Sequence, residues 1–177
     1  MAKPARLPSE YQEVEYIGTT VQTRLQSYIL TGVSSNNKSI ELKYERTTTV
    51  TSGPIIITSY NPSNLSSVVA PWAAADGRTS GGGVTITPAL SVIDTPEIYT
   101  VQFPATSYYI RIGGWTDTVW TAGSRYYYVK IFDSSTLIFD GVPCYRKSDG
   151  KTGLYDLIGQ AFVPNSGTEE FILGQNV

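Results

Sequence analysis

Apolar and polar residues alternate with a period of two through much of this chain, and this pattern limits its fold more than any other feature. Residues 39–45 are the clearest case, because Ile40, Leu42 and Tyr44 fall on one face of an extended strand. No stretch carries the 3.6-residue apolar stripe of a helix, and turn signals recur at the spacing typical of sandwiches and barrels. The chain is therefore predicted to be an all-β antiparallel sandwich.

Other runs with strand composition extend this prediction along the chain. They cover residues 13–17, 28–30, 55–57, 84–87, 98–103, 108–112, 126–132 and 136–140. The last two flank a turn at residues 133–135 and predict a hairpin, while Asn36-Asn37 and Gly113-Gly114 predict further turns. At residues 156–158 we expect at most a brief helical turn.

The length of 177 residues suits one domain with one core. Residues 1–8 carry two prolines and little apolar content before Leu7, so they predict an extended arm that a neighbouring protein could order. Residues 9–177 are predicted to form the single domain, because the glycine-rich stretch at residues 81–83 is too short for an interdomain linker.

Composition removes several classes of function. Charged residues make up 16% and the formal net charge is −2, so no broad positive field favours nucleic acid or anionic lipid. Apolar stretches are far shorter than the ~20 residues of a membrane span, and the N-terminus lacks a signal core. The chain has no histidine, which removes Ser-His and Cys-His nucleophile pairs and imidazole metal sites. We expect no enzymatic activity and no cofactor.

Cys144 is the single cysteine of the chain, so no internal disulfide can form. It follows Pro143 at an expected strand end, and we interpret it as a buried small apolar residue rather than a reactive thiol.

Two groups of segments carry a pattern typical of one family. The first group is residues 7–17 and 28–33; the second is residues 129–133, 142–144, 153–157, Phe162, 165–168 and Phe171. In this order they resemble the concanavalin A-like (LamG-like) lectin/glucanase domains of phage and prophage virion proteins and of gut-bacterial surface proteins. The resemblance covers roughly the first 45 and last 50 residues and implies a jelly-roll fold. Relatives carry Asp in a Tyr-Ile-Asp-Thr-Gly run where this chain has Leu30, so the role of that carboxylate is not carried over.

Carboxylates are the candidate catalytic or metal-binding groups of this chain. Glu13 and Glu15 have the alternate spacing that glucanases of this superfamily use, but the dense acidic strand motif is missing, so a solvated strand face is the interpretation we favour. Glu169 and Glu170 would point to opposite faces of an extended chain. Single aspartates stand in turns, where local bonding to the backbone explains them better than calcium does: Asp76, Asp94, Asp117, Asp133, Asp149 and Asp156. We predict no metal site.

Aromatic residues give the best prediction of a binding surface. Trp72, Trp115 and Trp120 lie in expected loops or strand ends, and Asp76 and Asp117 stand near them as hydroxyl acceptors. Sugars stack their C–H faces on such rings, so these five residues are the predicted ligand site. The alternative is that the large rings close the ends of the sandwich.

Residues 126–128 are three successive tyrosines that straddle a strand, so at least one ring faces outward, and cross-strand packing explains it without a ligand.

These observations lead to one expected function and one alternative. We expect a non-enzymatic bacteriophage virion protein, a capsid or tail decoration displayed on the virion surface after assembly in the host cytoplasm. It would contact other virion proteins through the arm or a sheet edge, and would bind host or mucosal glycans weakly. The alternative is a carbohydrate-binding receptor-binding module at a tail tip.

Overall fold

The computed structural model describes the chain in several segments. These are residues 6–20, 26–48, 57–61, 63, 67–69, 72–73, 79–80, 84–88, 94–105, 108–113 and 123–177, with the backbone alone for 67–69, 72–73 and 79–80. The described residues form strands and turns and contain no helix. The predicted all-β class is therefore confirmed.

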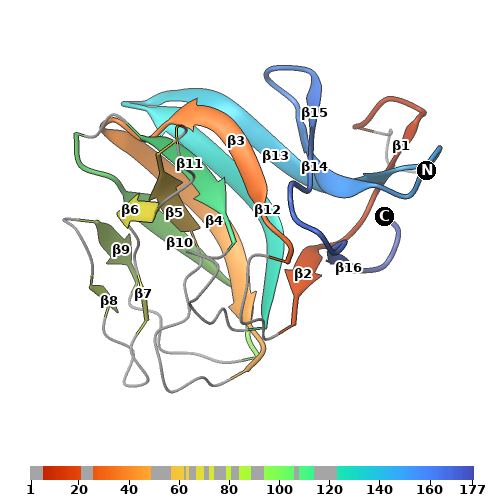
Figure 1. The fold of residues 1–177 in the computed structure, drawn as a ribbon, viewed down its shortest axis with the longest axis horizontal. Coiled ribbons are helices and arrows are strands. Elements are labelled where there is room, and N and C mark those ends of the chain that lie inside the picture. Colours follow the sequence, from red (N-terminus) through yellow and green to blue (C-terminus); the bar gives the residue numbers. More distant parts are fainter. Residues whose placement is uncertain are drawn as a thin grey trace.

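Most strands belong to two antiparallel sheets (Figure 1). The larger follows the order β15 (Ala161–Pro164), β14 (Thr152–Asp156), β13 (Thr136–Arg146), β12 (Ser124–Asp133), β4 (Lys38–Arg46), β10 (Glu97–Gln102) and β9 (Thr85–Thr87). Attached to this path are β1 (Tyr11–Glu13), β2 (Ile17–Thr19) and β16 (Ile172–Leu173). The smaller sheet has the order β3 (Ile29–Ser34), β11 (Tyr109–Ile112), β5 (Ile57–Tyr60) and β6 (Ser67–Val69), and a separate pair joins β7 (Trp72–Ala73) to β8 (Thr79–Ser80).

The two sheets pack face to face across one apolar core. Ile40, Leu42 and Tyr44 of β4 are at most 1% exposed, and they share a cluster with Ile110 and Ile112 of β11, which are fully buried. Figure 1 shows the smaller sheet lying in front of β4, β10 and β12. The inward face predicted for residues 39–45 is confirmed, and the arrangement is that of a two-layer β-sandwich. The jelly-roll topology stays a prediction.

The expected hairpin is present and longer than its two sequence runs. β12 and β13 pair from Val129↔Gly141 to Asp133↔Thr136, with Ser134 and Ser135 in the turn. The turn at Asn36-Asn37 is also confirmed, and Asn37 adopts a φ of 51° there.

β13 continues past the hairpin to Arg146. Cys144 therefore lies within this strand, whereas the sequence predicted it at a strand end. The thiol is buried in a second apolar cluster with Leu7, Val142 and Tyr155, and burial raises its pKa to about 12. Leu7 belongs to the predicted arm, so at least this residue of the arm contacts the domain; residues 1–5 lie outside the described part.

Two strand predictions and one helical-turn prediction need correction. The strand expected at residues 13–17 is divided between β1, which pairs with β13, and β2, which pairs with β12. Between them Val14 forms an isolated bridge with Asn176. The strand expected to end at Thr31-Gly32 continues to Ser34, since Gly32 accepts a φ of 71° without a side-chain clash. Residues 157–160 are the turn of the β14–β15 hairpin rather than a helical turn. Of the strand expected at residues 55–57, only Ile57 is described.

Candidate functional site

The side chains of the five predicted ligand-site residues lie outside the described part of the structure. Trp72 begins β7 and pairs with Ser80 of β8, but its side chain lies outside the described residues. Trp115, Trp120, Asp76 and Asp117 lie outside them altogether. That these side chains come together stays a prediction, and the described residues form a different candidate site.

A β-bulge in β12 turns two neighbouring tyrosines toward the outer face of the larger sheet. Tyr126 pairs with Tyr44 and Tyr128 pairs with Lys43, so Tyr127 is an extra residue on β12. Tyr126 is 1% exposed in the core, whereas Tyr127 and Tyr128 are half-buried and contact charged side chains of the outer face. Strict alternation would have exposed one of these two rings and buried the other.

Tyr127 is held in a network centred on the buried carboxylate of Glu45. The Tyr127 hydroxyl donates to Glu45 at 2.5 Å, and Nη1 of Arg125 donates to both oxygens of that carboxylate at 3.2 Å. The Arg125 guanidinium lies 4.9 Å from the centre of the Tyr16 ring, and Nζ of Lys43 lies 4.9 Å from the centre of the Tyr127 ring. Burial, together with the hydrogen bond to Glu45, raises the pKa of Tyr127 to about 12.

Tyr128 has the same kinds of partner as Tyr127, a carboxylate on its hydroxyl and a lysine over its ring. Its hydroxyl donates to Glu41 at 3.1 Å, and Nζ of Lys130 lies 5.2 Å from its ring centre. Burial and the hydrogen bond to Glu41 raise the pKa of Tyr128 to about 12. We call this outer-face group the tyrosine platform: Tyr16, Tyr127 and Tyr128 with Glu41, Glu45, Lys43, Arg125 and Lys130.

A pocket of about 190 Å³ adjoins the platform and shares Tyr16 and Arg125 with it. The rest of its lining is rich in hydroxyl groups and glycine: Gly18, Thr19, Thr20, Thr47, Thr48, Gly123, Ser124 and Ile172. Gly123 fixes one wall, because its N–H donates to Oγ1 of Thr48 at 2.8 Å and its carbonyl accepts from the N–H of Thr47 at 2.9 Å. Each hydroxyl can donate and accept, so this lining suits a ligand with several hydroxyl groups.

A second hollow of about 120 Å³ lies across the end of β2 and shares Gly18, Thr19, Thr20 and Ile172 with the pocket. Its other lining residues are Gln26, Ser27, Glu169 and Glu170. Burial acts to raise the pKa of Glu170, but hydrogen bonds from Lys151 and Thr152 outweigh it and hold the pKa below its ordinary value. Glu169 instead accepts from Gln26 at 2.7 Å, so the two carboxylates serve separate contacts.

Two of the acidic residues considered in the sequence, Asp156 and Glu13, form hydrogen bonds with other parts of the domain. Asp156 accepts from the N–H groups of Asp140, Ile158 and Gly159 at 2.9 to 3.0 Å, and so closes the β14–β15 turn. Glu13 accepts from Arg6, while Glu15 is exposed. In the described part of the chain no group of three or more acidic or cysteine side chains is gathered as metal ligands would be.

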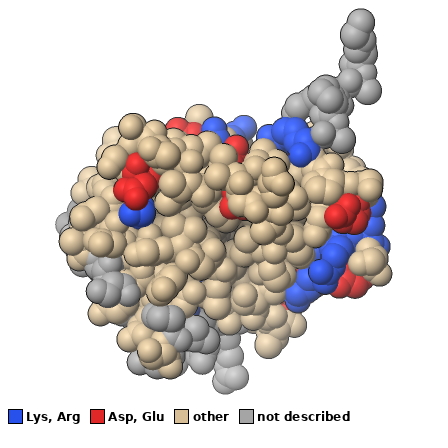
Figure 2. Space-filling model, turned by 90° about the horizontal axis from the view of Figure 1, so that it is seen from above, with Lys and Arg blue, Asp and Glu red and all other residues tan. Residues whose placement is uncertain are grey.

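Charges on the visible surface are sparse and mixed. Figure 2 shows small groups of both signs separated by uncharged surface. None of the described segments is a helix long and apolar enough to cross a membrane.

Fold and site together define an all-β antiparallel domain that carries an aromatic and charged platform beside a hydroxyl-lined pocket. No family model matches the chain, and no curated protein and no solved structure matches it either. Its function must therefore be argued from the site.

Proposed function

We propose that this chain is a non-enzymatic glycan-binding domain displayed on a phage virion. The observation that carries the glycan part is the bulge that turns Tyr127 and Tyr128 outward together, next to the hydroxyl-lined pocket. The virion part is supported by the resemblance of the first 45 and last 50 residues to virion domains.

Sugar chemistry matches the platform in two ways. A pyranose ring presents an apolar C–H face, which packs on a tyrosine ring, while its hydroxyl groups need donors and acceptors around that ring. Glu41 and Glu45 supply acceptors beside the hydroxyl groups of Tyr128 and Tyr127. Arg125 and Lys130 supply donors beside the rings of Tyr16 and Tyr128. The network already fixes these side chains, so binding orders few of them anew and costs less entropy.

The test is a glycan array read with the intact chain and four single variants. Tyr127→Ala removes the ring and Tyr127→Phe keeps it, so the first is expected to weaken binding at least about tenfold and the second less. Gly123→Ala places a Cβ 2.4 Å from Oγ1 of Thr47 and narrows the pocket, so it too should weaken binding. Ile158→Ala, at a residue 51% exposed in the β14–β15 turn, is the matched control and should bind normally.

Two outcomes would count against the platform. Absence of binding to every glycan by a folded chain would leave a structural display role as the better account. Binding that survives Tyr127→Ala but disappears in Trp72→Ala, Trp115→Ala or Trp120→Ala would move the site to the tryptophans that the sequence singled out.

Virion attachment has its own tests. Mass spectrometry of purified virions should detect the chain, and its absence from them would reject this part of the proposal. A monomer or dimer in analytical ultracentrifugation would favour a decoration over the alternative, a receptor-binding module at a tail tip, for which a stable trimer is expected. A trimer fits both, and a gene beside the tail genes rather than the capsid gene would then favour the tail tip.

A further inference from the structure

Arg46 is a buried cation at the end of β4. Its residue is 4% exposed, and its Nε and Nη1 atoms are buried without an acceptor anywhere in the described part of the chain. No ion pair among the described residues includes it. A guanidinium taken out of water without a partner costs several kcal/mol.

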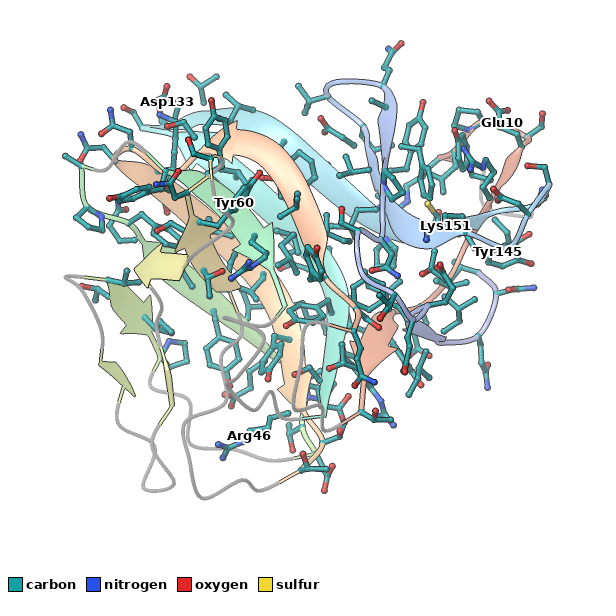
Figure 3. The ribbon with its side chains drawn as sticks, viewed as in Figure 1. Glu10, Arg46, Tyr60, Asp133, Tyr145 and Lys151 are labelled. Carbon is teal, nitrogen blue, oxygen red and sulfur yellow. The ribbon has the colours of Figure 1, made fainter. Side chains whose placement is uncertain are left out.

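The strand period places Arg46 away from the platform. Successive residues point to opposite faces, so Glu45 faces outward and Arg46 faces inward, in line with Tyr44. Figure 3 shows Arg46 at the opposite end of β4 from Lys38, the residue that pairs with the labelled Asp133. Arg46 therefore lies at the end of β4, next to Thr47 and opposite Ser124 of the pocket lining, with its side chain on the face away from the platform.

Neighbouring polar groups do not neutralise the guanidinium. The Tyr44 hydroxyl is bonded to Oγ of Ser124 at 2.9 Å, and the Tyr99 hydroxyl donates to Glu97 at 2.8 Å. The positive charge of Arg46 acts to lower the pKa of both tyrosines, but neither forms a hydrogen bond with its Nε or Nη1 atom. Nε and Nη1 of Arg46 are thus buried donors without an acceptor in the described part of the chain.

We propose that Arg46 is the anchor of a second binding site, which takes a small oxyanion group: a carboxylate, phosphate or sulfate. A planar guanidinium presents its N–H groups as a fork that matches two oxygens of such a group. An anion there would supply the missing acceptors and compensate the buried charge. This site is independent of the platform, and its failure would leave the glycan proposal standing.

Thermal unfolding of the intact chain tests the proposal, with sodium phosphate, sodium sulfate and sodium glucuronate as probes at constant ionic strength. Glucose is the neutral match for glucuronate. At ten times its Kd, an oxyanion that binds should raise Tm by about 3 to 6 °C. The probe that acts distinguishes a free phosphate or sulfate from the carboxylate of an acidic sugar.

Arg46→Met provides the control, because phosphate and sulfate stabilise most proteins without a specific site. The shift should disappear in this variant, and Arg46→Lys, which keeps the charge but loses the fork, should show a smaller shift. Without oxyanions, Arg46→Met should be at least as stable as the parent chain, because it removes an uncompensated charge. Equal shifts in the parent chain and Arg46→Met, or a lower Tm of Arg46→Met in oxyanion-free buffer, would overturn the proposal.

Discussion

Ile110 tests the contact between the two sheets. Its side chain is fully buried on β11 of the smaller sheet and packs in the core shared with the larger sheet. Ile110→Ala removes three carbon atoms from this contact, and a truncation of this kind costs about 3 kcal/mol, the sum of lost transfer energy and a cavity. For a chain of this size we expect Tm to fall by about 6 to 12 °C.

Ile98→Ala is the matched control, because Ile98 also lies in a strand but is 55% exposed. Both variants lose the same strand preference, so the difference between them measures burial alone. Urea unfolding should show a lower midpoint for Ile110→Ala at an unchanged slope, and a small shift for Ile98→Ala. Equal midpoint shifts in the two variants would refute the packing of the sheets described above.

Three further predictions concern close packing, pH and the thiol. Gly153→Ala should destabilise the domain by about 3 kcal/mol in urea unfolding, because the new Cβ would lie 2.3 Å from the carbonyl oxygen of Val163. Gly150→Ala is the comparison: its Cβ would meet open space, so only the φ of 71° should cost stability, about 1 kcal/mol. Burial raises the pKa of Tyr44 to about 12, above its value of about 10 in the unfolded chain, so its contribution to stability is complete below pH 10 and is lost as the pH rises toward 12. Unfolding at pH 9 and pH 11.5 should show this loss, and Tyr44→Phe should reduce it; an equal loss in the variant would contradict the assignment. Cys144 should resist a thiol reagent in the native protein at pH 8 and react after denaturation, whereas rapid native labelling would show that it is accessible.

Several parts of the candidate site could not be predicted from the sequence. The sequence predicts that the three tyrosines at residues 126–128 alternate across the strand. Only the pairing of β12 with β4 shows that Tyr127 is an extra residue, and this register depends on residues more than 80 positions apart in the chain. The pocket likewise joins segments around Gly18, Thr47 and Gly123, which no local pattern connects.

The sequence by itself determined the all-β class, the inward face of residues 39–45, the β12–β13 hairpin and the burial of Cys144. These features follow from contacts between near neighbours: the side chains of a strand alternate with a period of two, and short turns need particular residues. Tertiary structure decided which strands pair, where the bulge falls and why Arg46 is buried, because each depends on segments that meet only when the two sheets close. The platform and the buried guanidinium are therefore properties of the folded sandwich, whereas the strands of the sandwich follow from the local alternation of apolar and polar residues.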